Sequence, residues 1–152
     1  MKFEIINIEE FSGRKAQIYS VMYEGDDMTL MDHFFEDNGK DHQEELEEIA
    51  SKLHVMGNDT GCREHFFKLN EGALGDGVVA LSYNRMRLYC LRYDNTCIFI
   101  GSGGYKPPNI RAYQEYPFLN SKAQEMKRIA TCIITAIQEK DLPVMRENKF
   151  EI

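Results

Sequence analysis

The sequence predicts an α+β protein: a mainly antiparallel sheet, two helices packed on one face of that sheet, and a further helix near the C-terminus. Three observations support this fold class. Short runs of β-branched and aromatic residues are separated by turn residues, two helical stretches carry capping signals, and the last long segment has a helical apolar stripe. With 152 residues, 43% of them hydrophobic, the chain is long enough to form a single domain, residues 1–152, around one core.

The N-terminal part predicts two strands followed by two helices. The strands are expected over residues 2–8 and 16–24, with Ser12-Gly13 as turn material between them. Thr29 can cap a helix over residues 30–38, which stops at the next glycine. Asp41 with Glu44 resembles a capping pair for a second helix over residues 42–56. This second helix has one apolar stripe, formed by Leu46, Ile49, Ala50 and Leu53.

The central part predicts a three-stranded meander over residues 78–83, 86–93 and 96–100. Before it, residues 60–69 fit either a short helix or a strand, and residues 70–77 form a loop. Two-residue turns at Asn84-Arg85 and Asp94-Asn95 would fix the strand register. The expected pairs are Tyr83 with Met86, Leu81 with Leu88, Val79 and Phe99 with Cys90, and Arg92 with Cys97. Arg87 would then lie between Ser82 and Ser102, where a glycine-rich segment leaves the sheet.

The last element is predicted to be a helix from about Ser121 to Lys140. Ser121 with Gln124 forms a capping box, and Pro143 ends the helix. Its buried stripe is expected to comprise Ala123, Met126, Ile129, Ala130, Ile133, Ile134 and Ile137.

Charge is distributed unevenly along the chain, whose net charge is −7. Residues 1–60 carry 15 acidic and 5 basic residues, whereas residues 61–152 carry 10 acidic and 13 basic ones. Residues 85–128 alone contain 8 bases and 3 acids. Such a sign asymmetry permits a localised surface that binds anions.

The basic segment follows directly after the glycine-rich stretch "GSGG", residues 101–104. Glycine lets the backbone bend sharply or approach a ligand closely, although a plain turn is also typical of such a stretch. It is not a nucleotide P-loop, because Pro107-Pro108 prevents the helix that this motif requires. Lys106, Arg111 and Tyr113 come next and fit either a solvated loop or a site for a phosphodiester.

A phosphodiester site without a metal needs this set of residues. Arg87, Lys106 and Arg111 would bind the phosphate and stabilise the charge that develops in the transition state. Tyr113 could exchange a proton with the attacking 2′-hydroxyl or the leaving oxygen. Aromatic rings such as those of Tyr89, Tyr105 and Tyr113 could stack on unpaired bases. We expect the RNA-contacting surface to comprise Ser82, Tyr89, Ser102, Gly103, Gly104 and Tyr105.

Several other classes of site and location are disfavoured. Cys62, Cys90, Cys97 and Cys132 form no CxxC pair and have no histidine at metal-ligand spacing, so we expect buried free thiols, no metal site and no cofactor. The N-terminus lacks the apolar region of a signal peptide, and the longest apolar stretch is about half of a membrane span. An untargeted cytoplasmic protein is expected.

The pattern "RLYCLRY…CIFIGSGGYK…IRAYQE", within residues 78–116, resembles the C-terminal half of RelE/HigB-type toxins of bacterial toxin–antitoxin systems. In that family, a strand with an arginine enters a hairpin, and a Lys/Arg-rich segment leads to a tyrosine. The resemblance implies ribosome-dependent cleavage of mRNA by 2′-hydroxyl attack, without a metal. Arg87 would contact the scissile phosphate, Lys106 and Arg111 would stabilise the transition state, and Tyr113 would orient or exchange the proton.

The resemblance also implies partners: mRNA on the ribosome, and an antitoxin protein that neutralises the toxin and can form an oligomer with it. Three features depart from the family. The chain is acidic, residues 1–27 are additional, and residues 78–83 lack the usual bases. A non-catalytic RelE/ParE-like relative is therefore an alternative, either an inhibitor of a protein such as a topoisomerase or a protein without toxic activity. A small-ligand binding domain that uses the glycine-rich corner is a third hypothesis.

Overall fold

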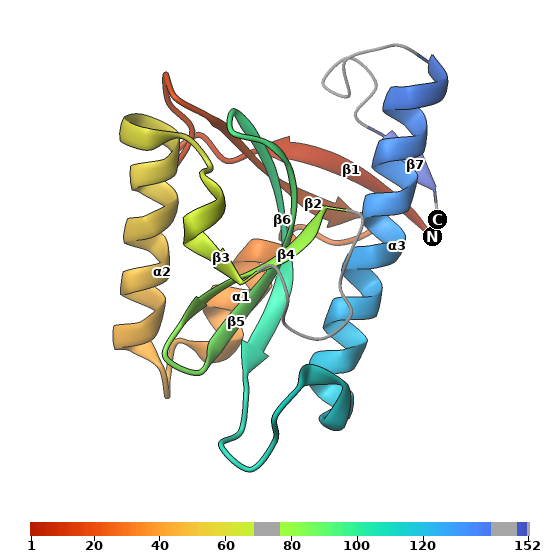
Figure 1. Ribbon diagram of the computed structural model, residues 1–152. Helices are drawn as coiled ribbons and strands as arrows, with labels where there is room; N and C mark the ends of the chain where they lie inside the picture. The colour runs from red at the N-terminus through yellow and green to blue at the C-terminus, as the bar shows by residue number, and fades with distance from the viewer. Residues whose placement is uncertain (69–76, 141–148, 152) are drawn as a thin grey trace.

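The computed structural model describes residues 1–68, 77–140 and 149–151 (Figure 1). Its strands are β1 (Lys2–Asn7), β2 (Gln17–Tyr23), β3 (Phe67–Lys68), β4 (Val78–Tyr83), β5 (Met86–Asp94), β6 (Cys97–Tyr105) and β7 (Lys149–Glu151). Its α-helices are α1 (Leu30–Asn38), α2 (Gln43–Val55) and α3 (Pro117–Lys140). A π-helical turn, η1 (Met56–Thr60), and two 3₁₀ turns, η2 (Glu64–Phe66) and η3 (Tyr113–Glu115), complete the described elements.

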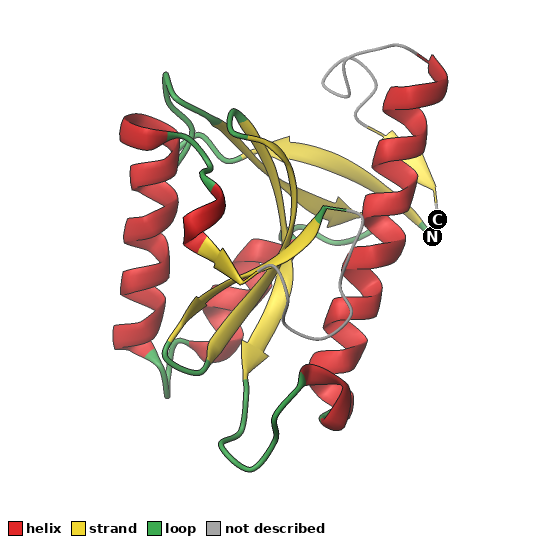
Figure 2. Cartoon of the chain, in the orientation of Figure 1, coloured by secondary structure: helices red, strands yellow, loops and turns green. Residues whose placement is uncertain are grey.

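The strands form one sheet in the order β3-β4-β5-β6-β2-β1-β7. Neighbouring strands are antiparallel except for β2 and β6, which are parallel. Helices α1 and α2 lie on one side of the sheet and α3 lies on the other, as Figures 1 and 2 show. The predicted α+β class, with a mainly antiparallel sheet, two helices on one face and a C-terminal helix, is confirmed.

The two faces of the sheet carry separate hydrophobic cores. The face under α1 and α2 includes Met86, Leu88 and Cys90 of β5, as the predicted register implied. The opposite face is covered by α3 and includes Tyr89 and Leu91. Both faces of β5 are therefore buried over residues 86–91, whereas Tyr93 and Asp94 at its end are exposed.

The predicted capping signals have different outcomes in the two N-terminal helices. In α1, the Thr29 hydroxyl accepts a hydrogen bond from the Asp32 amide, and the Asp32 carboxylate accepts one from the Thr29 amide, both 3.1 Å long. The predicted Asp41–Glu44 cap of α2 is wrong. The helix begins after His42, which makes no side-chain capping bond and whose ring stacks on Tyr105 with centroids 4.7 Å apart.

Other predicted boundaries also change. Residues 60–69 contain both of the open alternatives, the 3₁₀ turn η2 and the strand β3. Helix α3 begins at Pro117 and not at Ser121, because proline at the first helical position has a suitable φ and needs no amide partner. The predicted Ser121–Gln124 capping box is therefore wrong. The predicted stop at Pro143 and all but the last residue of the predicted loop at 70–77 lie outside the described residues.

The strand register is as predicted in the first hairpin but shifted in the second. Tyr83 pairs with Met86, Leu81 with Leu88, and Val79 with Cys90, which confirms the prediction for β4 and β5. Between β5 and β6, Asp94 pairs with Cys97, Arg92 pairs with Ile98 and Cys90 pairs with Ile100, so the predicted partners Cys97 and Phe99 are wrong. The Asp94 carboxylate accepts bonds of 2.8 Å from the amide and hydroxyl of Thr96, which makes Asn95-Thr96 the turn. Two register shifts then follow along the pair.

The glycine-rich stretch is part of strand β6 and does not leave the sheet as predicted. A Cβ atom at Gly103 would lie only 1.9 Å from the carbonyl oxygen of Arg87 on the paired strand. At Gly101 it would lie 2.4 Å from Met126 Sδ, and at Gly104 it would lie 2.6 Å from Phe118 Cε1. These glycines therefore allow β5 and α3 to approach β6 closely.

We predict that Gly103→Ala destabilises the protein by about 2–4 kcal/mol, because backbone must move to make room for one methyl group. Gly25→Ala is the matched control. Gly25 has a φ of +89° but nothing within 4 Å of its Cβ position, so only backbone strain of about 1 kcal/mol is expected there. Urea unfolding measures both free energies. Equal effects of the two substitutions would contradict the close approach of β5 and β6.

Candidate functional site

The β4–β5 turn lies beside the end of β6 at one end of the sheet, and basic residues of both segments lie in this region. The Lys106 amide donates to the Arg85 carbonyl over 2.7 Å. In return, Arg85 Nε donates to the Lys106 carbonyl over 2.6 Å, and Arg85 Nη2 donates to the Pro107 carbonyl over 2.7 Å. We call this part of the molecule, Arg85, Arg87, Lys106 and Arg111, the basic end. Through these bonds, Arg85 connects the β4–β5 turn to the residues that follow β6.

Arg87 is buried within the basic end, with 4% of its surface exposed. Its Nη1 atom donates to the carbonyl oxygens of Asn84 at 2.8 Å and Met86 at 2.9 Å. Asn84 has a φ of +52°, as expected at a tight turn. Arg87 thus stabilises the turn that precedes it. It lies opposite Ser82, as predicted, but opposite Gly104 on β6 and not Ser102, because of the register shift.

Lys106 and Arg111 differ in their access to solvent. Lys106 is buried, with 8% of its surface exposed, whereas Arg111 is exposed. The amides of Arg111 and Ala112 donate to the Glu115 carboxylate. These hydrogen bonds hold the pKa of Glu115 below its usual value, and the bond from the Arg111 amide has the largest effect. The carboxylate therefore stabilises the turn, and the Arg111 guanidinium belongs to the surface.

Tyr113, the predicted proton-transfer residue, has no exposed surface. Its ring packs edge-to-face on Tyr89, which is equally buried, with centroids 5.8 Å apart. Lys127 of α3 donates to its hydroxyl over 3.3 Å. Both tyrosines belong to the core between the sheet and α3, so neither ring is presented to a base from solvent in this arrangement.

The other predicted RNA-contacting residues are likewise either buried or partly exposed. Ser102 is 5% exposed, and Gly103 and Gly104 are buried. Ser82 and Tyr105 are partly exposed, and Tyr105 carries the stacked ring of His42. The surface of the basic end is therefore smaller than predicted.

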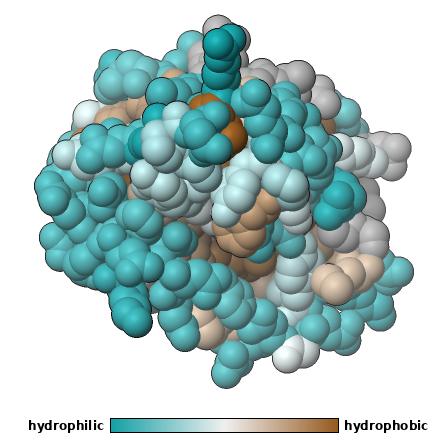
Figure 3. Space-filling model, turned by 90° about the horizontal axis from the view of Figure 1, so that it is seen from below, coloured by the Kyte–Doolittle hydropathy of each residue, from teal (hydrophilic) through white to brown (hydrophobic). Residues whose placement is uncertain are grey.

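Two residues at the basic end were missed as site candidates. His42 belongs to no sequence motif, but its ring stacks on Tyr105 at the end of β6. Phe118 lies in the first turn of α3 and is 45% exposed. The segment "EYPFLNSK" contains an aromatic residue after a proline and before a lysine, a signal that could have suggested a surface position. Figure 3 shows this end as a mainly hydrophilic surface with a few apolar patches.

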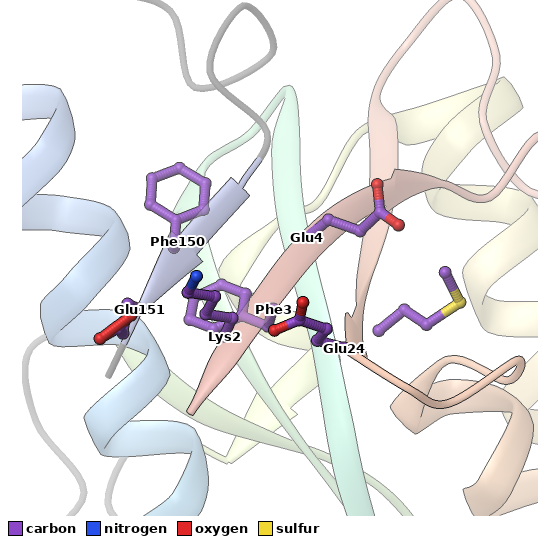
Figure 4. Close-up of a pocket in the computed structure, with 7 residues that line it drawn as sticks. Lys2, Phe3, Glu4, Glu24, Phe150 and Glu151 are labelled. Atoms are coloured by element: carbon purple, nitrogen blue, oxygen red, sulfur yellow. The ribbon is translucent and has the colours of Figure 1, made fainter.

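A surface groove of about 470 Å³ lies away from the basic end and is lined by residues of β1, β7 and the end of β2 (Figure 4). Its apolar part includes the stacked rings of Phe3 and Phe150, whose centroids are 5.4 Å apart. Three carboxylates and one ammonium group also line it, those of Glu4, Glu24, Glu151 and Lys2. This excess of acid does not suit a phosphate, so the groove is no alternative RNA site.

The described residues contain no group of three or more His, Cys, Asp or Glu side chains that could hold a metal ion. Within the same residues, no helix has the length and apolar character required to cross a membrane. Comparison with family models, curated proteins and solved structures finds no match for this chain.

We predict that Arg87→Ala destabilises the protein by about 2–4 kcal/mol, because two carbonyl groups of the turn lose a charged donor. Arg111→Ala, at an exposed position, should change the free energy of unfolding by less than about 0.5 kcal/mol. Thermal or urea unfolding of the two variants measures the difference. If Arg87→Ala proved as mild as Arg111→Ala, the structural role of Arg87 would be refuted.

Proposed function

We propose that this chain is a RelE/HigB-like toxin: a metal-independent endoribonuclease that cleaves mRNA on the ribosome in the cytoplasm and is neutralised by an antitoxin protein. One observation carries the proposal. Arg85 and Arg87 from the β4–β5 hairpin meet Lys106 at the end of β6, as their paired backbones and hydrogen bonds require. A chain with a net charge of −7 thus gathers cations at one end.

The proposal assigns different roles to the exposed and the buried cations. Arg111 and the partly exposed Arg85 are available to phosphates of an incoming strand. Arg87 and Lys106 are buried and add positive potential in a region of low dielectric. In the transition state of 2′-hydroxyl attack, this charge would stabilise the pentacoordinate phosphate.

The burial of Tyr113 means that catalysis through this residue requires a structural change. Its hydroxyl is held by Lys127, in the middle of α3, so proton transfer through Tyr113 requires this part of α3 to move away from the sheet. The RNA-bound ribosome would have to supply the free energy for that movement. An antitoxin that covers the basic end would oppose RNA binding directly.

The burial of Arg87 and Tyr113 favours a second candidate function. A non-catalytic RelE/ParE-like relative that inhibits a protein, such as a topoisomerase, needs no access to Arg87 or Tyr113. The small-ligand hypothesis loses its physical basis, because the Cβ positions of the three glycines are occupied by Met126, Phe118 and the backbone of Arg87.

We predict that induced expression in a bacterial host arrests growth and creates new mRNA 5′ ends in translated messages. Arg111→Glu should reduce cleavage at least about tenfold, because it replaces a phosphate contact by a repelling charge. Arg14→Glu, an exposed control outside the basic end in the β1–β2 connection, should not change it. Tyr113→Phe should reduce cleavage about 10²–10⁴-fold if Tyr113 transfers the proton.

The other outcomes separate the candidates. Arrest with intact mRNA would favour the protein inhibitor. Normal growth with intact mRNA, from protein shown to be folded, would contradict both toxin activities. Each variant is first checked by urea unfolding, so that loss of activity is not confused with loss of the fold.

A further inference from the structure

Phe118 is an exposed aromatic residue that the fold does not bury. Of the large hydrophobic residues in the described ranges, Met1, Tyr93 and Phe118 are exposed. Phe118 is 45% exposed and is the second residue of α3. Single exposed hydrophobic residues are common and need no explanation by themselves, so its surroundings decide whether it has a function.

The ring of Phe118 is held from several sides. It rests on the backbone of Gly104, where an added Cβ would lie 2.6 Å from Cε1. Lys122, one helical turn further along α3, places Nζ 5.4 Å from the ring centroid. The ring of Tyr116 lies 6.0 Å away, tilted by 48°. These contacts fix the ring while almost half of the residue's surface faces solvent.

The location of Phe118 connects it to the basic end. Gly104, on which the ring rests, is the strand partner of Arg87. Exposed Arg111 lies in the loop that leads to α3, and the first turn of α3 contains no acidic residue. The nearby acid Glu115 has its carboxylate bonded to the amides of Arg111 and Ala112. An aromatic surface with cations around it is what single-stranded nucleic acid recognition uses.

We propose that Phe118 is a stacking platform for one unpaired RNA base and that Lys122 binds the adjacent phosphate. This inference rests on the proposed function, which it deepens by naming an unpaired, single-stranded segment as the substrate. Every base has a π-face, so the platform tolerates any sequence. Inside a duplex both faces of a base are already stacked, so internal bases of duplex RNA cannot use it.

The test uses the absence of tryptophan from the chain. Phe118→Trp introduces a single fluorescent reporter that conserves an aromatic ring, and Tyr93→Trp is the matched control. Tyr93 is 48% exposed near the other end of β5, about 20 Å along the strand from its start. Single-stranded decauridylate should quench the fluorescence of Phe118→Trp and leave that of Tyr93→Trp unchanged. A duplex of the same length should quench neither.

Affinity provides a second readout. The Kd of labelled decauridylate should rise about tenfold in Phe118→Ala, as expected for the loss of one stacked base. Lys122→Gln should reduce the slope of log K against log salt concentration by about 0.7, as expected for one lost phosphate contact to a single strand. Circular dichroism confirms that each variant is folded.

The outcomes distinguish this inference from the proposed function. If Arg111→Glu weakens RNA binding but Phe118→Ala does not, and Phe118→Trp is not quenched, the platform is refuted and the proposed toxin stands. Equal quenching of both tryptophan variants also refutes it, as does failure of the wild-type chain to bind the RNA. Cleavage in the expression experiment decides the proposed function independently.

Discussion

The close approach of β6 to its neighbours is the constraint on which the rest of the structure depends. Gly103 lies against the carbonyl of Arg87, and Gly101 and Gly104 lie against Met126 and Phe118 of α3. Without side chains at these positions, β5 and β6 remain paired and α3 covers the second face of the sheet. That packing buries Tyr89 and Tyr113 and fixes the ring of Phe118 at the surface. The glycines therefore act through packing, and no ligand is needed to explain them.

The same packing divides the basic end into a buried and an exposed part. Arg87 stabilises a turn and Arg85 connects the turn to the loop after β6, so these side chains hold the end together. Arg111 and Phe118 remain accessible to a partner. In this arrangement, binding of RNA and cleavage of RNA require different parts of the structure. Contact needs the residues that are already exposed, whereas chemistry by Tyr113 needs α3 to move.

Local signals in the sequence predicted the fold class, most strands, the α1 cap and the β4–β5 register, because these features depend on short-range pattern. The second hairpin could not be predicted correctly, since the Asp94 side chain bonds to Thr96 and moves the turn by one residue. The burial of Arg87 and Tyr113 could not be predicted either, because it depends on which face of the sheet α3 covers. The hairpin topology predicts that Arg87 lies near the end of the glycine-rich strand, but its partner there is Gly104 and not the expected Ser102.

Hydrogen exchange of the backbone amides in residues 101–106 tests most directly whether the glycine-rich stretch is an internal strand. The Lys106 amide bonds to the Arg85 carbonyl, and the amides of β6 that pair with β5 should be similarly protected. We predict exchange as slow as that of the β4–β5 pair, with or without added nucleotide or RNA. Rapid exchange that becomes slow only on addition of a ligand would contradict the account. It would show a loop that a ligand orders, and the positions assigned to Arg87, Tyr113 and Phe118 would no longer hold.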